Sequence, residues 1–335
     1  MEHNAAITAN ALSIGYRTDR QVYTVHSGLD FSLRQGELTC LLGANGAGKS
    51  TLLRTLSASQ PALGGELTVM GKPLKDYTER ERSRTIGVVL TDKTFAGGLT
   101  VYELAGLGRQ PHTGFFGRLR KEDKRIIDEA LENVGISHKR QSYVAELSDG
   151  ERQKALIAKA LVQECPLILL DEPTAFLDVV SRIEIMNLLH RLAAEQGKAI
   201  LLSTHDIEQA LTLADRLWLL SAEHGLLCGE TEDMVLAGHM DSLFDNRGIC
   251  FDYDSGSYSP KVSGGRDISV VCEDKTTLHW TLNALRRHGF NIMPADAEHC
   301  SMRLEVASKN ELRLKHDGQV LDCTSFEALI QQIEL

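Results

Sequence analysis

The sequence predicts an α/β fold with a mostly parallel sheet, followed by a small α+β domain. Through the first two-thirds of the chain, short apolar runs alternate with segments of helical spacing. Strands that alternate with helices form parallel sheets covered on both faces. Beyond about residue 238 this alternation ends, and 335 residues exceed one ordinary domain. We therefore expect two domains, residues 1–237 and residues 238–335.

The elements of the first domain follow from apolar periodicity. The expected strands cover residues 11–15, 29–33, 37–42, 66–70, 86–90, 167–170, 199–203 and 216–220. The expected helices cover residues 51–56, 78–84, 101–107, 121–134, 148–163, 179–196 and 207–214. The run 167–170 is apolar throughout, which is typical of a central strand. The helix at 148–163 opens with Ser148 and Glu151, a capping-box pattern.

The second domain shows shorter elements. The expected strands cover residues 267–272, 291–294, 302–306, 311–314 and 319–323, and the expected helices cover 276–288 and 326–333. Gly256, Pro260 and residues 263–265 predict turns or a linker before them. The first of these helices carries three leucines that are expected to pack into the domain core: Leu278, Leu282 and Leu285.

Composition excludes several classes of protein. With 42% hydrophobic and 24% charged residues the chain is typical of soluble globular proteins. A net charge of -10 argues against a nucleic-acid partner. The seven cysteines form no CxxC pair, which argues against a zinc site or a disulfide framework. We see no signal-peptide pattern and no apolar run near the ~20 residues of a membrane span. Any work at a membrane is therefore expected to go through a partner.

The strongest motif is a glycine-rich loop between the strand at 37–42 and the following helix. Residues 43–51 read GANGAGKST, which matches G-x-x-x-x-G-K-[ST] in the strand–loop–helix context that the motif requires. Glycines let backbone N–H groups turn toward phosphate oxygens, and the helix N-terminus favours an anion. A lysine adds a cation, and a hydroxyl can ligate Mg²⁺. The residues expected to bind a nucleotide here are Gly43, Asn45, Gly46, Gly48, Lys49, Ser50 and Thr51.

Two carboxylates follow the apolar strand at 167–170. Asp171 is expected to hold Mg²⁺, and Glu172 to act as the general base that polarises the attacking water. Alone, such a pair is often only a polar strand exit, but after a phosphate-binding loop it favours a nucleotide hydrolase. His205 follows the next strand, from which an imidazole can reach a γ-phosphate.

Taken together, the motifs from about Ala11 to Thr231 resemble the ATPase subunits of ABC transporters. The resemblance implies a P-loop NTPase fold of ABC type, with a helical subdomain at about residues 92–163. Residues 147–153, LSDGERQ, resemble the family's signature sequence. The resemblance implies that Ser148 and Gly150, together with Asp178 in the segment Phe176-Leu177-Asp178, act on ATP bound to a second copy. A homodimer is therefore expected.

The same resemblance assigns roles to single residues near the loop. His205 matches the family's switch histidine, and Tyr16 stands where an aromatic ring stacks on adenine. Two positions depart from the family pattern. Asp149 replaces the usual signature glycine and brings a negative charge near a phosphate site. Thr91 stands where a glutamine is expected to contact Mg²⁺ or the lytic water, so its hydroxyl is the expected ligand and altered coupling or slower hydrolysis is the hypothesis.

The segment 99–123 resembles ATPases that serve importers of iron–siderophore complexes, haem or cobalamin. It implies ATP and Mg²⁺ as cofactors, membrane permease subunits as partners, and indirectly a substrate-binding protein. It also implies a peripheral location at the cytoplasmic face of the inner membrane. Phe115, Phe116, Arg118 and Arg120 are expected near the permease groove. Residues 238–335 are an accessory, regulatory or dimerising domain by analogy only. The alternatives are a soluble ATPase of a non-transport machine and a regulatory nucleotide-binding module with little turnover.

Overall fold

The computed structural model describes residues 4–18, 21–89, 98–114, 117–243, 248–253, 255–260, 265–294, 300, 302–316 and 318–333. The chain divides into two units. The first comprises Met1–Asp245 with Phe251–Ser257, and the second comprises Asn246–Cys250 with Tyr258–Leu335. Each unit has its own hydrophobic core, so each is described by itself.

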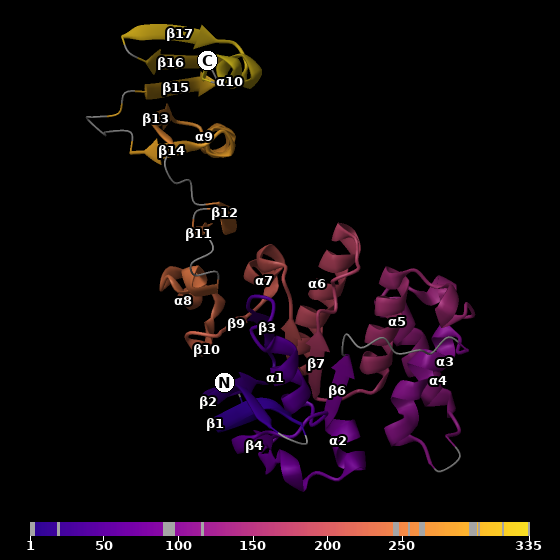
Figure 1. The fold of residues 1–335 in the computed structure, drawn as a ribbon. Coiled ribbons are helices and arrows are strands. Elements are labelled where there is room, and N and C mark those ends of the chain that lie inside the picture. Colours follow the sequence, from indigo (N-terminus) through magenta and orange to yellow (C-terminus); the bar gives the residue numbers. More distant parts are fainter. Residues whose placement is uncertain are drawn as a thin grey trace. The chain divides into compact units, whose positions relative to one another are not determined.

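A six-stranded sheet in the first unit has the order β10-β9-β3-β8-β7-β6 (Figure 1). Its strands are β3 (Leu38–Leu42), β6 (Ile86–Val89), β7 (Leu167–Asp171), β8 (Ala199–Ser203), β9 (Arg216–Ser221) and β10 (Gly225–Glu230). All neighbours pair in parallel except β9 and β10. Every residue of β3, β7 and β8 is buried. The prediction of a mostly parallel sheet with β7 in its interior is confirmed.

A second, antiparallel sheet has the order β2-β1-β4-β5. It comprises β1 (Ala5–Arg17), β2 (Val22–Arg34), β4 (Gly64–Val69) and β5 (Lys72–Pro73). The prediction of two short strands at 11–15 and 29–33 was wrong, because β1 and β2 are 13 residues each. Polar residues on the solvent face of β1 and β2, together with β-bulges in their pairing, interrupt the alternation that the sequence shows.

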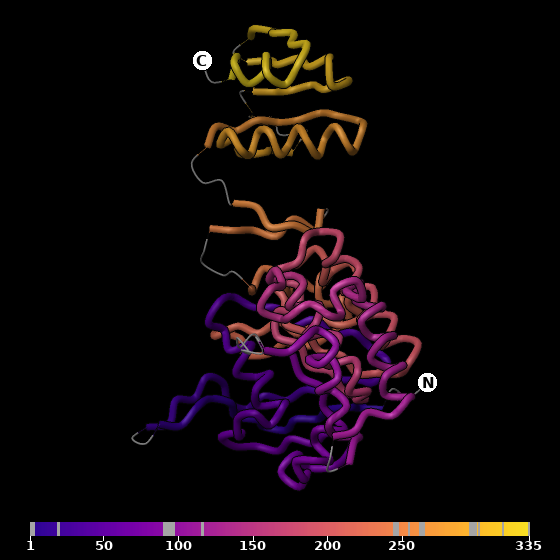
Figure 2. The backbone as a smooth tube through the Cα atoms, turned by 90° about the vertical axis from the view of Figure 1, so that its right-hand side faces the viewer, coloured from indigo at the N-terminus to yellow at the C-terminus, as the bar shows by residue number. Residues whose placement is uncertain are grey.

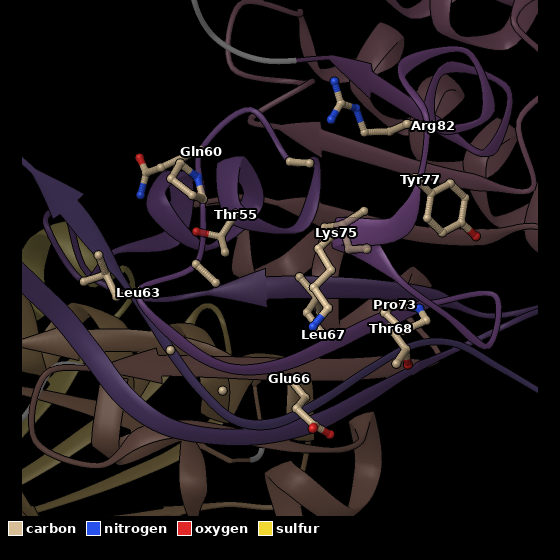
Figure 3. Close-up of a pocket in the computed structure, with 16 residues that line it drawn as sticks. Thr55, Gln60, Leu63, Glu66, Leu67, Thr68, Pro73, Lys75, Tyr77 and Arg82 are labelled. Carbon is tan, nitrogen blue, oxygen red and sulfur yellow. The ribbon is translucent and has the colours of Figure 1, made fainter.

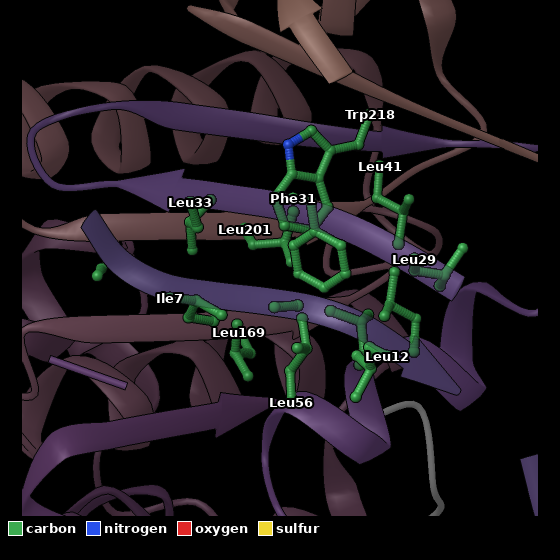
Figure 4. Close-up of a cluster of buried hydrophobic side chains, with 14 of the residues drawn as sticks. Ile7, Leu12, Leu29, Phe31, Leu33, Leu41, Leu56, Leu169, Leu201 and Trp218 are labelled. Carbon is green, nitrogen blue, oxygen red and sulfur yellow. The ribbon is translucent and has the colours of Figure 1, made fainter. Parts of the chain in front are cut away.

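The core of the first unit lies between these two sheets and α1 (Lys49–Leu56). Figure 4 shows side chains from β1, β2, α1 and the parallel strands gathered in one cluster. Phe31 of β2 packs against Trp218 of β9 with ring centroids 4.7 Å apart. Burial of such side chains is the main favourable term in folding, and here it fixes the helix that follows the glycine loop.

The other helices of the first unit fall into two groups. Around the sheets lie α2 (Glu79–Thr85), α6 (Val179–Gln196), α7 (Ile207–Leu213) and α8 (Thr231–Leu236), with short 3₁₀ turns at Leu74–Asp76 (η1) and His239–Leu243 (η5). A helical subdomain contains α3 (Val101–Gly106), η2 (Leu107–His112), α4 (Lys121–Asn133), η3 (Ser137–Lys139), η4 (Val144–Glu146) and α5 (Asp149–Val162). The predicted helices are all present, whereas α8 and β10 were not predicted.

A buried arginine links the helices of this subdomain. Arg109 Nε donates to Asp123 Oδ1 at 2.9 Å, and Arg109 Nη1 donates to the carbonyl of Val162 at 3.0 Å and to Glu164 Oε2 at 2.6 Å. Arg109 and Asp123 are both buried. The guanidinium therefore joins η2, the start of α4 and the end of α5.

The second unit is a five-stranded sheet with two helices. Its order is β14-β13-β15-β16-β17. The elements are β13 (Arg266–Cys272), α9 (Lys275–Arg287), β14 (Phe290–Met293), β15 (Met302–Ser308), β16 (Glu311–His316), β17 (Gln319–Cys323) and α10 (Phe326–Ile333). Figure 2 shows α9 lying along β13 and β14 within this unit. The α+β prediction is confirmed, and Leu278, Leu282 and Leu285 pack into its core as expected.

The segment before β13 contains a hairpin, β11 (Ile249–Asp252) with β12 (Ser257–Pro260). The predicted turn at Gly256 is confirmed, because Gly256, with φ of 66°, lies in the connection between the two strands. Pro260 was predicted in a turn or linker but is the last residue of β12, and residues 263 and 264 lie outside the described residues. Among the described residues, no helix has both the length and the apolar character of a membrane span.

Candidate functional site

The glycine loop leaves β3 at Leu42 and enters α1 at Lys49. Gly48, just before the helix, has φ of 100°, a backbone conformation that side chains with a Cβ avoid. At Gly43, an added Cβ would lie 2.4 Å from the carbonyl oxygen of Leu220 on β9. Asn45, Gly46 and Ser50 are exposed. The loop is therefore packed tightly against the sheet at its start and open to solvent at its tip.

Lys49 is the cation at the centre of this loop and is only 6% exposed. Its Nζ donates to the carbonyls of Gly43 at 2.8 Å and Ala44 at 3.3 Å. Burial lowers the pKa of Lys49, while the negative charges of Glu172 and then Asp171 oppose that shift. The carboxylates and the loop carbonyls thus hold a desolvated amine where the motif expects a phosphate-binding cation.

His205 and Glu172 meet beside this amine. His205 Nε2 lies 2.7 Å from Glu172 Oε1 and 3.5 Å from Lys49 Nζ. Because an ionised carboxylate only accepts hydrogen bonds, the shorter contact places the proton on His205 Nε2 and directs it to Glu172. The structure therefore brings together the three predicted residues that come from the glycine loop and from the ends of β7 and β8.

Asp171 completes this group at the carboxyl end of β7. It is buried, and its Oδ1 accepts a hydrogen bond from Ser203 Oγ at 2.6 Å. Glu172 follows with φ of 49°, in the left-handed region that non-glycine residues seldom adopt. Its N–H donates to Ser203 Oγ at 3.0 Å. Ser203 was missed by the sequence analysis, because a single serine at the end of an apolar strand is no motif.

A buried histidine supports the glycine loop from the other sheet. His26 of β2 is buried, and its Nε2 lies 2.7 Å from the carbonyl oxygen of Ala47. Since a carbonyl can only accept, His26 Nε2 carries the donated proton. This contact was also missed, because nothing in the sequence connects position 26 to the loop.

Tyr16 lies near the end of β1 and is half exposed. Its ring stacks on Tyr23 of β2 with centroids 5.2 Å apart and planes 25° apart. Two partly exposed aromatic rings therefore stand at this end of the antiparallel sheet. The second ring, Tyr23, was not singled out from the sequence.

The signature residues lie around a different cavity. Ser148, Gly150 and Asp178 line a cavity of about 450 Å³. Its lining contains none of Lys49, Asp171, Glu172 and His205. Ser148 caps α5 in a complete capping box with Glu151, as predicted. Asp178 caps α6 by accepting from the N–H of Ser181 at 2.8 Å, a role not predicted.

The charge of Asp149 is balanced locally. Its Oδ1 pairs with Arg152 Nη1 at 2.7 Å, and the side chain of Asp149 is exposed. The charge at this signature position is therefore shared with a cation one helical turn away. Thr91, Phe115 and Phe116 lie outside the described residues.

Two further cavities lie away from the glycine loop. One of about 890 Å³ lies between parts of α2 and η2 and is lined by Arg80, Ser83, Pro111 and Gln163 among others. The other, about 590 Å³, is bounded by the segment after α1, β4, η1 and α2 (Figure 3). Its lining contains none of the predicted site residues.

Comparison with known proteins gives matches along most of the chain. The family model described as ABC transporter matches residues 26–175, and the model described as iron ABC transporter C-terminal domain matches residues 265–334. An uncharacterized ABC transporter ATP-binding protein of Methanocaldococcus jannaschii is 36% identical over 78% of this chain and 89% of its own length. The ferric enterobactin transport ATP-binding protein of Escherichia coli is 36% identical over 75% of this chain and 91% of its own length.

A third relative and a solved structure agree with these matches. The iron(3+)-hydroxamate import ATP-binding protein of Bacillus subtilis is 39% identical over 61% of this chain and 75% of its own length. A structure described as an inward-facing, metal-chelate type ABC transporter superposes with a TM-score of 0.61 at 29% identity, over 72% of this chain and 89% of that one. The fold expected from the resemblance is confirmed. Because relatives 36% identical to it match over about nine-tenths of their own length, the chain belongs to the ATP-binding proteins of ABC transporters.

Proposed function

We propose that this chain is the ATP-hydrolysing subunit of an importer for a ferric siderophore or a related metal chelate. The observation that carries the ATPase assignment is the group Lys49, His205, Glu172 and Asp171, gathered beside the glycine loop. The substrate class is supported by the names of relatives that serve ferric enterobactin and iron(3+)-hydroxamate. The iron ABC transporter C-terminal domain model over the second unit supports it further.

ATP is proposed to bind with its phosphates on the glycine loop. Backbone N–H groups at the start of α1 and the Lys49 ammonium supply positive charge where negative charge develops on the γ-phosphate. Tyr16, stacked on Tyr23, offers a flat, exposed face for the adenine ring. His26 holds the loop backbone from behind through the carbonyl of Ala47.

The hydrolytic step is proposed to use Glu172. An ionised carboxylate at this position accepts the proton of a water as the water attacks the γ-phosphate. His205 Nε2–H orients that carboxylate through the 2.7 Å contact. Lys49 Nζ lies 3.5 Å from the same imidazole nitrogen. Since that nitrogen donates to Glu172 and an ammonium can only donate, the cation lies beside this pair without a hydrogen bond to the imidazole.

Mg²⁺ fits the donor set as a nucleotide-bound ion. The described residues hold no cluster of three or more His, Cys, Asp or Glu side chains suited to a metal. Mg²⁺ with nucleotides is usually held by one or two protein oxygens plus phosphates and waters. Ser50 and Asp171 would supply those oxygens, with Thr91 as a further proposed ligand. The ion would neutralise charge on the phosphates.

A second copy is proposed to complete the site. Ser148 and the N-terminus of α5 are exposed, and a helix N-terminus favours an anion. Beside them, Phe176, Val179 and Val180 expose 58%, 67% and 66% of their surfaces. Exposed apolar side chains gathered at one place favour a protein interface. We propose that this surface meets the glycine loop of the other copy, with Asp178 at the seam.

The membrane partner is proposed to dock at the cleft of about 890 Å³ between α2 and η2. This cleft is lined by residues of α2 and of the helical subdomain. A permease segment bound there would therefore move when the helical subdomain moves relative to the sheets. We also propose that the chain works with permease subunits and an external substrate-binding protein, in a peripheral position at the cytoplasmic face of the inner membrane. The second unit is proposed to be an accessory, regulatory domain.

Two measurements test this function. The purified full-length chain should hydrolyse ATP when Mg²⁺ is present, Lys49→Ala should lose this activity, and Lys75→Ala, a change at an exposed lysine, should keep it. Cells that carry the chain with its permease should take up iron-labelled siderophore, and the Lys49→Ala strain should not. A chain that hydrolyses ATP but never co-purifies with a membrane permease would instead support the non-transport ATPase.

A further inference from the structure

One polar side chain in the site was not singled out from the sequence. Ser203 is the last residue of β8 and is 0% exposed. Its hydroxyl is therefore shielded from solvent. In the parallel pairing of β7 and β8, Ser203 is the register partner of Asp171, so the sheet itself brings the hydroxyl to the two carboxylates.

The Ser203 hydroxyl uses both its donor and its acceptor capacity there. It donates to Asp171 Oδ1 at 2.6 Å and accepts from the N–H of Glu172 at 3.0 Å. An O–H bonded to an ionised carboxylate is a charge-assisted and therefore strong hydrogen bond. One buried side chain thus bonds to the side chain of Asp171 and to the backbone of Glu172.

The backbone of Glu172 needs such support. With φ of 49° it lies in a region that a non-glycine residue rarely occupies. Its N–H also lies 3.2 Å from the carbonyl oxygen of Ser203, so the hydroxyl and the carbonyl of Ser203 both accept from it. The direction in which Glu172 leaves β7, and hence its 2.7 Å contact with His205, depends on these bonds.

We infer that Ser203 is a positioning residue for ATP hydrolysis, acting through Asp171 and Glu172. The inference rests on the proposed function. Because Ser203 lies between the two carboxylates and not at the glycine loop, its loss should disturb the hydrolytic step and leave nucleotide binding in place. A residue with only a general structural role would lower stability and change both kinetic constants together.

The test is the ATPase activity of Ser203→Ala in the full-length chain. We expect kcat to fall by about tenfold to a hundredfold, since a hydrogen bond to a charged group is worth roughly that factor. The KM for ATP should stay within about twofold, since Lys49 and the loop are unchanged. Ser203→Thr keeps the hydroxyl and should restore kcat. Ser203→Cys replaces the hydroxyl by a slightly larger thiol, which is a weak donor, and should remain slow.

A control and the opposing results separate this inference from the proposed function. Ser57→Ala removes another buried serine hydroxyl, one that bonds only near the end of α1, and should keep the wild-type kcat. Wild type and Lys49→Ala are run in the same assay, so a wild-type chain without activity refutes the function itself. An active wild type matched in kcat by Ser203→Ala and Ser203→Cys would refute only the role of Ser203. If Ser203→Ala does not fold, Ser203→Cys decides.

Discussion

The buried arginine of the helical subdomain offers a prediction whose size follows from the structure. Arg109→Ala removes three hydrogen bonds, to Asp123, Glu164 and the carbonyl of Val162. It leaves the carboxylate of Asp123 buried without its cation. Breaking a buried ion pair by removing one partner costs about 3–5 kcal/mol. The contact with Glu164 adds little, because half of that side chain is exposed.

Arg125 is a matched control in the neighbouring helix α4. It forms ion pairs with Glu122 and Glu129, and its side chain is 57% exposed, against 8% for Arg109. Exposed pairs are worth about 0–1 kcal/mol. Arg125→Ala should therefore lower the free energy of unfolding by less than about 1 kcal/mol, and Arg109→Ala by several times as much.

The assay is denaturant unfolding followed by tryptophan fluorescence. Trp218 is buried in the core of the first unit and Trp280 is exposed on α9, so a Trp280→Phe background reports on the first unit alone. The double variant Arg109→Ala/Asp123→Asn should recover part of the free energy of unfolding that Arg109→Ala loses, because no unpaired charge is left buried. Equal losses for Arg109→Ala and Arg125→Ala would refute the reasoning.

The same pair predicts a dependence on pH. The N–H of Arg120 first, and the guanidinium of Arg109 in addition, hold the pKa of Asp123 below its usual value, while burial opposes them. A carboxyl whose pKa is lowered in the folded state stabilises the fold at pH values above its unfolded pKa of about 3.9. This stabilisation is lost as the pH falls through the folded-state pKa. The difference between wild type and Arg109→Ala should be constant near neutral pH and should shrink below about pH 4.

Three further predictions concern the site itself. Glu172→Gln should reduce ATP hydrolysis by at least about a hundredfold while calorimetry still detects ATP binding; hydrolysis at the wild-type rate would contradict the base assignment. In the Glu172→Gln background, light scattering should detect a dimer with ATP, and Val180→Asp should abolish it, because the substitution puts a charge into the exposed apolar surface. A dimer that persists in Val180→Asp would show that the interface lies elsewhere. His26→Phe should raise the KM for ATP by about threefold to tenfold, because the hydrogen bond to the carbonyl of Ala47 is lost. An unchanged KM would show that the conformation of the glycine loop does not depend on His26.

Much of the fold could be predicted, because its signals are local. The helix at 179–196 and the strand at 199–203 have the predicted bounds in the structure. These bounds were predicted from apolar periodicity, and the structure adds the caps that set them: Asp178, whose capping role was not predicted, starts α6, and Gly197, with φ of 64°, ends it. Capping and glycine signals of this kind lie within a few residues of the boundary that they set.

What could not be predicted depends on distant partners. All six residues of β10 are partly buried, so its short sequence shows no alternation of apolar and polar residues that would predict a strand. Its place in the sheet comes from its pairing with β9. The same holds for the site: the motif residues were identified from the sequence, but Ser203 and His26 gain their roles from strand register and from packing between sheets. Such contacts leave no pattern in a single sequence.

The strand order of the parallel sheet also has a consequence for how the chain is made. β3, which leads into the phosphate-binding loop, hydrogen-bonds to β8 and β9; Leu38 pairs with Ile200 and Thr39 with Arg216. Synthesis runs from the N-terminus, so the five buried residues of β3 emerge from the ribosome long before either partner exists. Loop closure over such separations is slow. We therefore expect the growing chain to carry an unpaired apolar strand during much of its synthesis, a state in which chains are prone to aggregate.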